Sequence, residues 1–417
     1  MIEASGGEIV ATPDLADAAV FNSCAVTAAA EADLRQSVRR AARVRPDLQT
    51  VVMGCAAARD DGAIASLPSV DRVVPGADVV AVAAALGFRA PERAPNVQTG
   101  TRALLRIQDG CDEHCTFCAT TLARGAARSR DVDALVDEAS RLADRHPEIV
   151  LTGIHIGHFG VDTGESLSAL VERLVLAVPR VRFRLSSLEA TEVDDRLFDL
   201  FADRTRLVPH LHAPLQSGSD LLLKRMGRHW YTAATYAGAV ERMVSRYAPF
   251  ALGADVIVGF PGETDADHAA TVALIESLPF TYLHVFPFSL RPGTSAERLP
   301  SRVDGVLADR RARELRAIGD ACVERHRAER AGQECDVVAI GSGAQREGLT
   351  EDYLTVAVDP TIPRGARFRA RLEGGAEALR ATVIPSDTEL SSRAAAAVIP
   401  SVSEGSSRTS SWLGSVP

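Results

Sequence analysis

The sequence predicts an α/β protein with an N-terminal parallel-sheet domain, a partial (β/α)6 barrel and a small C-terminal β-barrel. Up to about residue 330, short apolar segments alternate with helical segments, which is typical of parallel sheets. From residue 334 onward the pattern changes to short strands separated by Gly-containing turns. The chain has 417 residues, more than one hydrophobic core ordinarily holds, so two or three domains are expected.

The N-terminal domain is expected over residues 1–90. Its expected elements are a strand at 16–24, a helix at 28–44 that Thr27 could cap, and a strand at 48–55. The strands end at Cys24 and Cys55. Carboxyl ends of parallel strands carry ligand sites, so both thiols are candidate ligands. The Pro-rich stretch 88–100 predicts a linker.

The barrel is expected over residues 98–330. Its six expected strands are TRALLRIQ (101–108), EIVLTG (148–153), VRFRLSSLE (181–189), HLHAPLQ (210–216), ALGADVIVGF (251–260) and YLHVFPFS (282–289). Helical segments separate them, and a long Arg-rich helix is expected at 303–331. In barrels of this kind the chemistry takes place at the carboxyl ends of the strands.

The C-terminal barrel is expected over residues 331–385, built from strands that begin near 335, 353, 367 and 379. Arg367, Arg369 and Arg371 alternate with apolar residues, so they share one strand face and could contact RNA phosphates. An ordinary exposed strand face in an Arg-rich chain explains them equally well. The Ser- and Ala-rich tail 386–417 is expected to be disordered.

Composition sets limits on the class of protein. The net charge of −9 argues against a broadly basic nucleic-acid binder, although a local basic groove remains compatible with it. The sequence has no apolar run of membrane-spanning length and no secretory signal at its start, so a cytoplasmic protein without membrane contact is expected. In that reducing compartment, cysteine clusters point to metal binding or catalysis.

Cys111, Cys115 and Cys118 form a C-x3-C-x2-C run after the first barrel strand. A thiol stripe on one helix face is the simplest alternative, and zinc is another. Structural zinc sites favour four ligands in paired knuckles, and no fourth ligand follows here at that spacing. Three thiolates on a four-iron cubane leave one iron open, which suits catalysis. The run therefore predicts a [4Fe-4S] cluster.

This run, placed after the first strand of a six-strand barrel, resembles the radical S-adenosylmethionine superfamily. The resemblance implies that the reduced cluster cleaves S-adenosylmethionine and yields a 5′-deoxyadenosyl radical that abstracts hydrogen, with a reducing electron donor as partner. It also implies that strand-end residues bind S-adenosylmethionine; the candidates are Thr152, Gly153, Ser187, Glu189, Gln216 and Gly259.

Nine longer motifs narrow the resemblance to the methylthiotransferases, up to about residue 385. They are FNSCAVTAAAEAD (21–33), VVMGCAA (51–57), RGAARSR (124–130), GIHIGHFG (153–160), RLSSLEATEV (184–193), HAPLQSGSD (212–220), MGRHWY (226–231), GFPGET (259–264) and FSLRPGTSA (288–296). The family combines a domain that holds a second [4Fe-4S] cluster, a radical barrel and a TRAM β-barrel.

Within this family, RLSSLE and GIHIGHFG favour the branch that acts on threonylcarbamoyladenosine next to the tRNA anticodon, so the anticodon stem–loop is the expected partner. Methylthiolation of isopentenyladenosine tRNA or of a ribosomal protein is the alternative, and a non-catalytic RNA-binding protein with a vestigial cluster is an alternative of another class. Arg128 could pair with a carboxylate of cofactor or substrate, or form a surface ion pair.

The N-terminal domain of this family contributes three thiolates, whereas this chain supplies Cys24 and Cys55. The third would fall upstream of Met1, so we expect either a start assigned too late or a degraded second site, and favour the former. Two thiolates hold a cubane poorly. The chain as printed is therefore expected to keep cofactor cleavage and to lose most methylthiolation.

Overall fold

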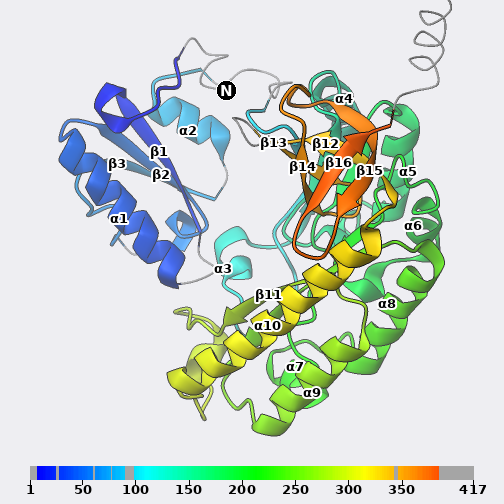
Figure 1. The fold of residues 1–417 in the computed structure, drawn as a ribbon. Helices are drawn as coiled ribbons and strands as arrows, with labels where there is room; N and C mark the ends of the chain where they lie inside the picture. Colours follow the sequence, from blue (N-terminus) through cyan, green and yellow to red (C-terminus); the bar gives the residue numbers. More distant parts are fainter. Residues whose placement is uncertain are drawn as a thin grey trace, which may run out of the picture.

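The structure, a computed structural model, describes residues 7–24, 28–59, 62–76, 78–89, 98–341 and 346–384 (Figure 1). The helix cap expected at Thr27, most of the linker expected at 88–100 and the tail expected at 386–417 lie outside the described residues. The described parts form the α/β architecture that the sequence predicts, with parallel sheets followed by a closed β-barrel.

The N-terminal domain is a three-stranded parallel sheet in the order β1 (Ala18–Ser23), β2 (Gln49–Gly54), β3 (Val70–Pro75). Helix α1 (Ala28–Val44) spans the residues expected for it and packs Leu34 and Val38 into a core with Val52. The other elements are the short helix α2 (Val79–Ala85) and the 3-10 turns η2 (Pro13–Leu15) and η3 (Ala57–Arg59). Both strands that precede a cysteine therefore end at the same sheet edge.

Six parallel strands form the barrel, and their order in space follows their order in the chain. One sheet pairs β4 (Ala103–Arg106), β7 (Glu148–Thr152) and β8 (Arg182–Leu185); the other pairs β9 (His210–His212), β10 (Ala251–Val258) and β11 (Tyr282–Pro287). Single bridges from Phe183 to Leu207 and from Ser187 to His212 join the two sheets. No pairing among the described residues joins β4 to β11, so the barrel is partial.

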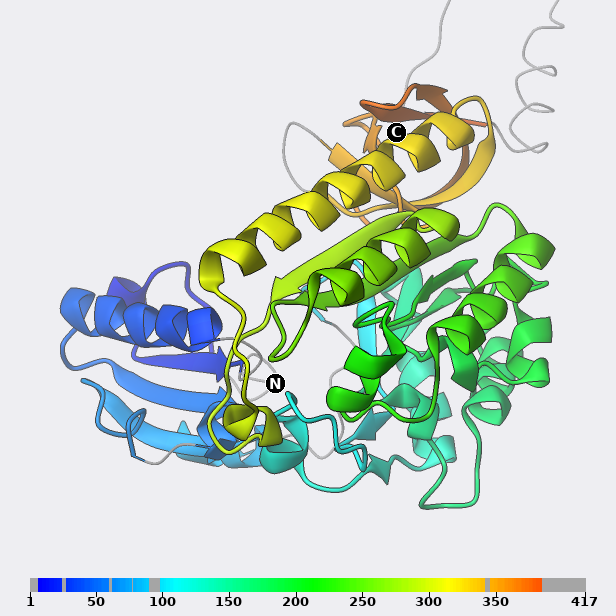
Figure 2. The same cartoon turned by 90° about the horizontal axis from the view of Figure 1, so that it is seen from below.

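Helices cover the outer face of these strands (Figures 1 and 2). They are α4 (Val132–Leu142), α5 (Leu167–Ala177), α6 (Asp195–Leu200), α7 (Asp220–Arg225), α8 (Ala233–Tyr247) and α9 (Asp265–Ser277). Helix α10 (Gly305–Arg330), which Asp304 caps, runs along β11 to the C-terminal barrel (Figure 2). Two short elements, β5 (Gln108–Asp109) and β6 (Arg128–Ser129), form a hairpin that encloses the cysteine loop and α3 (Thr120–Arg124). In the described part of the chain, no helix has both the length and the apolar character that a membrane crossing requires.

The C-terminal barrel closes with five strands, one more than the sequence predicts. They are β12 (Glu334–Ala339), β13 (Arg346–Thr350), β14 (Thr355–Val358), β15 (Arg367–Gly374) and β16 (Leu379–Val383), in the order β12-β13-β14-β16-β15. The sequence of the additional strand, β13, favours a turn because the segment is short and contains Gly348. A Cβ at Gly348 would lie 2.5 Å from Val337, so this glycine permits close packing inside the barrel.

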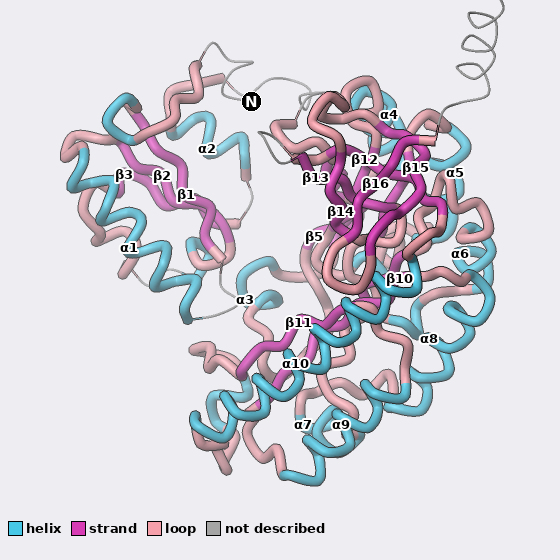
Figure 3. The backbone as a smooth tube through the Cα atoms, viewed as in Figure 1, coloured by secondary structure: helices cyan, strands magenta, loops and turns pink. Residues whose placement is uncertain are grey.

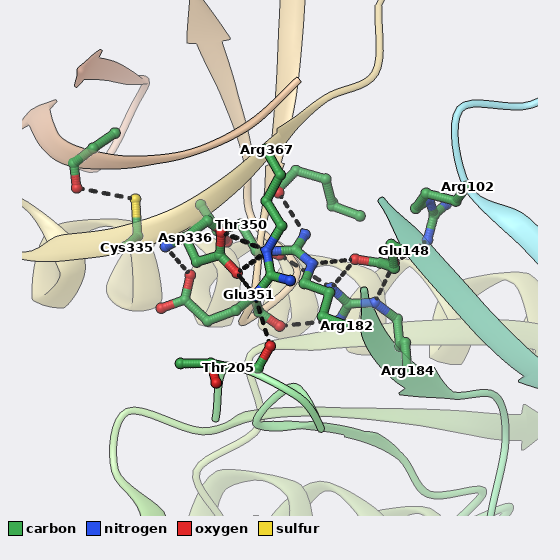
Figure 4. A network of polar contacts seen from close by, with 12 residues as sticks. Arg102, Glu148, Arg182, Arg184, Thr205, Cys335, Asp336, Thr350, Glu351 and Arg367 are labelled. Carbon is green, nitrogen blue, oxygen red and sulfur yellow. Dashed lines mark hydrogen bonds and ion pairs between the residues drawn. The ribbon is translucent and has the colours of Figure 1, made fainter. Parts of the chain in front are cut away.

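Buried arginines join this barrel to the radical barrel (Figure 4). Arg182 donates to the backbone oxygens of Asp336 (2.6 Å) and Leu349 (2.9 Å), and Arg184 donates to that of Glu351 (3.1 Å). Both guanidinium groups also pair with Glu148, at 2.6 and 2.9 Å. Burial acts to raise the pKa of Glu148, but Arg184 and Arg182 outweigh it and hold this pKa well below its usual range. The two barrels thus share an ionised, buried network.

The loop after β11 fixes the N-terminal domain. The buried Arg291 forms an ion pair with Glu31 of α1, Ser289 Oγ accepts the backbone N–H of Ala28 at 3.1 Å, and Arg59 donates to the backbone oxygen of Pro292. Figure 3 shows α3 between the N-terminal sheet and the barrel, where it contacts η3. These contacts bring the cysteine edge of the N-terminal sheet toward the C-x3-C-x2-C loop.

Candidate functional site

The cysteine loop is held by its backbone. Gly110 has a φ of 76°, and a Cβ there would lie 1.9 Å from the oxygen of Ala126, so only glycine fits. Next to it, the N–H of Cys111 donates to Gly125 O at 3.1 Å, and the N–H of Cys118 donates to Cys115 O at 3.1 Å. The loop therefore presents its three thiols at the carboxyl ends of the barrel strands, as the sequence predicts.

Each of the three thiols has a nitrogen partner. His155 Nδ1 lies 3.7 Å from Cys111 Sγ, Arg228 Nη1 donates to Cys115 Sγ at 3.6 Å, and the N–H of Thr120 donates to Cys118 Sγ at 3.3 Å. Hydrogen bonds to thiolate sulfur stabilise and tune iron–sulfur clusters. This donor set fits a cluster held by three thiolates.

His155 is oriented by two further residues. Its Nε2 lies 2.8 Å from Glu192 Oε1, and Gln108 Oε1 accepts its backbone N–H at 2.9 Å. Burial acts to lower the pKa of His155, but the contacts with Cys111 and Glu192 raise it to about 10. Gln108 also donates to Gly110 O at 2.7 Å. One amide side chain thus ties the cysteine loop to the turn that follows β7.

Arg228 links the cysteine loop to Glu189. It forms a buried ion pair with this carboxylate and donates to Tyr231 Oη at 2.8 Å. Burial raises the pKa of Glu189, while Arg228 opposes the shift. Burial also raises the pKa of Cys115 to about 12 in the absence of iron.

Glu189 Oε2 is buried without a hydrogen-bond partner, and Glu192 Oε2 is as well. Such carboxylate oxygens suit the ammonium or hydroxyl groups of S-adenosylmethionine.

The other strand-end candidates lie around this centre. Thr152 ends β7, and Gly153 follows it, where a Cβ would lie 2.9 Å from Gln108 O. Ser187 lies on the bridge between β8 and β9. Gln216 has a φ of 62° and borders a cavity of about 180 Å³ that Phe117 of the cysteine loop also lines. Their roles in binding S-adenosylmethionine stay predictions.

Gly259, the remaining candidate for binding S-adenosylmethionine, is surrounded by protein atoms. Its N–H already donates to Glu263 Oε2 at 2.5 Å, and a Cβ there would lie 2.6 Å from Ala308 Cβ of α10. Glu263 in turn pairs with the buried Arg311 of α10 at 2.9 Å. The geometry therefore explains this glycine by the packing of α10 against the end of β10.

Cys24 and Cys55 follow adjacent strands, as predicted. The N–H of Cys55 donates to Ser23 O at 3.0 Å. Burial raises the pKa of Cys55, and Arg124 opposes this shift. Both thiols follow parallel strands that end at the same edge of the N-terminal sheet. Their role as ligands of a second cluster stays a prediction.

The arginines proposed for substrate contact are partly engaged. Arg128 donates to the backbone oxygens of Ala126 and Arg124 at 3.1 Å and lines a cleft of about 490 Å³ next to α2. The three arginines of β15 also have partners. Arg367 pairs with Asp336 and donates to the backbone oxygen of Thr205. Arg369 and Arg371 both pair with Glu334. Carboxylates of β12 therefore lie beside the three arginines and offset part of their charge, and the contact with RNA phosphates stays a prediction. Arg367 serves the interface with the radical barrel, and Arg369 and Arg371 remain exposed.

Sequence reasoning missed the residues that position the site. Arg228 and His155 lie inside the motifs MGRHWY and GIHIGHFG. The sequence therefore indicated these motifs but did not reveal which residues Arg228 and His155 contact. Arg291 also lies inside a quoted motif, FSLRPGTSA, whereas Gln108 carried no motif signal. Each acts on a residue more than 40 positions away in the chain or in another domain, which a linear pattern does not reveal.

Comparison with known proteins agrees with this geometry. Residues 105–275 match the model of the radical SAM superfamily, and residues 1–76 match that of the uncharacterized protein family UPF0004. In the solved structure of the radical S-adenosylmethionine methyltransferase TsrM from Kitasatospora setae with cobalamin and a [4Fe-4S] cluster, the match covers 67% of this chain and 63% of that one. Its TM-score is 0.52 at 15% identity, which shows a shared fold.

The fold and the cysteine loop thus define a radical S-adenosylmethionine protein, a class that uses S-adenosylmethionine and a [4Fe-4S] cluster. The threonylcarbamoyladenosine tRNA methylthiotransferase MtaB of Bacillus subtilis is 34% identical, covering 83% of this chain and 83% of the relative. MtaB of Rickettsia prowazekii is 32% identical, covering 86% and 89%, and MtaB of Aquifex aeolicus is 31% identical, covering 84% and 90%. The chain belongs to this family, the threonylcarbamoyladenosine tRNA methylthiotransferases.

Proposed function

We propose that this protein is an enzyme that converts threonylcarbamoyladenosine next to the tRNA anticodon into its 2-methylthio derivative. The observation that carries the proposal is the group of three thiols in one loop, each with a nitrogen partner, beside the buried and unpartnered Glu189 Oε2. The proposal includes a reducing electron donor, the tRNA anticodon stem–loop as partner, and the cytoplasm as location.

When bound, the cluster and S-adenosylmethionine supply the one-electron chemistry that activates a C–H bond. The chain's own residues have simpler tasks. Cys111, Cys115 and Cys118 hold three irons, and Glu189 orients the cofactor. Arg228 keeps the Glu189 carboxylate and the Cys115 sulfur in fixed positions, because one planar guanidinium contacts both.

The closing test uses tRNA from a strain that lacks the gene. Nucleoside mass spectrometry should show loss of the 2-methylthio derivative and accumulation of threonylcarbamoyladenosine. An unchanged nucleoside profile, or loss of a derivative of isopentenyladenosine instead, would contradict the proposed substrate. Release of 5′-deoxyadenosine by reduced, reconstituted protein separates an enzyme from a non-catalytic RNA-binding protein, which would release none.

Iron content tests the second cluster. Since the chain supplies Cys24 and Cys55 but no third thiolate before the barrel, anaerobically reconstituted protein should bind about four irons tightly, as for one cubane. We expect it to cleave S-adenosylmethionine and to methylthiolate RNA weakly. A measured content of about eight tightly bound irons would contradict this expectation.

A further inference from the structure

The interior of the radical barrel contains a cavity beside the cluster site, and Ser187 lines it. Its volume is about 370 Å³, and ligand pockets begin at about 300 Å³. Strands β8 to β11 line one part of it, and Tyr353 of the C-terminal barrel lines another. Tyr353 lies in the turn between β13 and β14 with a φ of 68°, and its ring stacks on His210 at 4.6 Å. Two domains therefore build this cavity together.

The wall of the cavity is a connected polar group. His212 Nε2 and His284 Nδ1 lie 3.0 and 3.4 Å from Asp255 Oδ1. Tyr282 Oη lies 3.1 Å from His212 Nδ1 and 2.9 Å from His210 Nε2. Burial acts to raise the pKa of Asp255, but the hydrogen bonds from His212 and His284 outweigh it and keep this carboxyl ionised. The cavity is thus preorganised for a polar ligand.

Part of the hydrogen-bonding capacity of this wall is unused. His212 and His284 both lie against Oδ1 of Asp255. Ser186 Oγ and His210 Nδ1 are buried without a hydrogen-bond partner. Arg102 also lines the cavity, with Nη1 3.3 Å from Glu148 and 31% of its side chain exposed. Buried polar atoms are normally satisfied, so these atoms point to a ligand that completes them.

The cavity lies next to the radical site. Asp255 borders it and also borders the smaller cavity that Phe117 and Gln216 line. Phe117 is the residue just before Cys118 in the cysteine loop. A ligand that enters the barrel interior therefore extends toward the place where hydrogen abstraction occurs.

Resting on the proposed function, we propose that this cavity is the specificity pocket for the threonylcarbamoyl group of the substrate base. That group carries a carboxylate, a hydroxyl and urea N–H donors. Arg102 and the half-exposed His284 match the carboxylate, and the Asp255 carboxylate accepts from the urea. The C-terminal barrel then contributes to substrate choice through Tyr353, in addition to any contact with the RNA backbone.

A divalent cation is the other ligand that His212, Asp255 and His284 could hold, since their ligand atoms lie within 4.8 Å of one another. Their separations of 3.0 and 3.4 Å are ordinary for hydrogen bonds, and Arg102 at the same cavity disfavours a cation. The unpartnered donor and acceptor atoms fit an organic group better. Removal of metal ions with EDTA distinguishes a cation site from a site for an organic group.

The test measures binding of synthetic anticodon stem–loops by fluorescence anisotropy under anaerobic conditions. Three stem–loops are compared, which differ only at the position next to the anticodon. That position carries adenosine, threonylcarbamoyladenosine or isopentenyladenosine. The unsubstituted chain should bind the threonylcarbamoyl stem–loop about 10-fold more tightly than the adenosine one, because a charged group gains hydrogen bonds. The apolar isopentenyl group should give no such gain.

His284→Ala and Arg102→Gln should each reduce this preference to about 2-fold and leave the affinity for the adenosine stem–loop unchanged. Tyr353→Phe provides a third variant that keeps the ring and removes the hydroxyl. Arg173→Gln, at the exposed pair with Asp133, is the matched control and should keep the full preference. Thermal unfolding of each variant confirms that it is folded before binding is measured.

The outcomes distinguish the two proposals. No preference in the unsubstituted chain would contradict the proposed substrate. A preference that all three variants retain would overturn the pocket and leave the substrate standing. A preference that EDTA abolishes and Zn²⁺ restores would overturn direct recognition in favour of a cation site.

Discussion

At the scale of single residues, the site depends on side chains that each connect two parts of the molecule. Arg228 contacts the cysteine loop and Glu189, Gln108 connects the loop to the turn after β7, and Gly110 lets the backbone approach Ala126. None of these three is a cluster ligand. The precision of the centre therefore rests on the residues behind the thiols.

Arg228→Lys tests the connection to the cofactor residue. Lysine keeps a positive charge but cannot place one planar group against Cys115 and Glu189 together. Release of 5′-deoxyadenosine should fall about 10-fold or more, as is typical for residues that orient metal ligands. The iron content should be retained. Arg242→Lys, at the exposed pair with Asp195, is the control, and equal activity of the two variants would contradict the assigned role.

Gly110→Ala tests the backbone of the cysteine loop. A Cβ at this position meets Ala126 O at 1.9 Å, so the loop must shift and cluster binding should be lost. Gly164→Ala is a matched control, because its φ of 79° is equally unfavourable while nothing lies within 4 Å of the added atom. The control should lose about 1 kcal/mol of stability and keep its iron. Absorbance near the cluster band and iron analysis give the comparison; a brown Gly110→Ala protein would refute the argument.

At the scale of elements, the start of the strands matters as much as their ends. Glu148 at the start of β7 forms ion pairs with Arg182 and Arg184 of β8. These guanidinium groups also donate to backbone oxygens of the C-terminal barrel (Figure 4). The same docking places Tyr353 inside the radical barrel. The carboxyl ends of the strands thus carry the chemistry, and their amino ends hold the domain that completes the cavity.

Glu148→Gln should lower the free energy of unfolding by about 3–5 kcal/mol at pH 7, since it leaves buried guanidinium groups unpaired. The pKa of Glu148 is depressed in the folded state, so its contribution is complete above the unfolded pKa of about 4.3 and declines as the pH falls below it. The difference between the two proteins should therefore shrink in acid. Urea unfolding at pH 7 and pH 3.5 measures it, with the exposed Glu172→Gln as control. A difference that grows in acid would have the wrong sign.

At the scale of the whole molecule, the N-terminal domain is placed by the loop after β11. Arg291, Ser289 and Pro292 contact Glu31, Ala28 and Arg59 of that domain. The motif FSLRPGTSA therefore positions the N-terminal domain. It follows β11 and holds the N-terminal domain, which carries Cys24 and Cys55, against the barrel.

Arg291→Ala should loosen this domain without unfolding the barrel. Because Arg291 is buried and pairs with Glu31, its loss should make the N-terminal domain at least 10-fold more sensitive to limited proteolysis. Iron bound at Cys111, Cys115 and Cys118 should be unchanged. The control is Arg298→Ala, on the neighbouring turn η6 (Ser295–Arg298). Equal digestion of both variants would contradict the assigned contact.

The sequence by itself determined the order of the parallel sheets and the closed β-barrel, the six barrel strands, helix α1, the long helix α10 and the spacing of three cysteines in one loop. These features are local: strand and helix periodicity and the spacing of cysteines are written in adjacent residues. The fold class and the family are confirmed by the comparisons. The strand β13 was missed, because a short segment with a central glycine has no periodic signal of its own.

Only the tertiary structure decided which side chains meet. It placed Arg228 on Cys115 and Glu189, put carboxylates of β12 beside the arginines of β15, and turned Gly259 toward α10. It also brought Tyr353 from the C-terminal barrel to His212 and Asp255 through the ring of Tyr282. These contacts join residues far apart in the chain, and their energies depend on burial and direction, which a linear pattern does not contain.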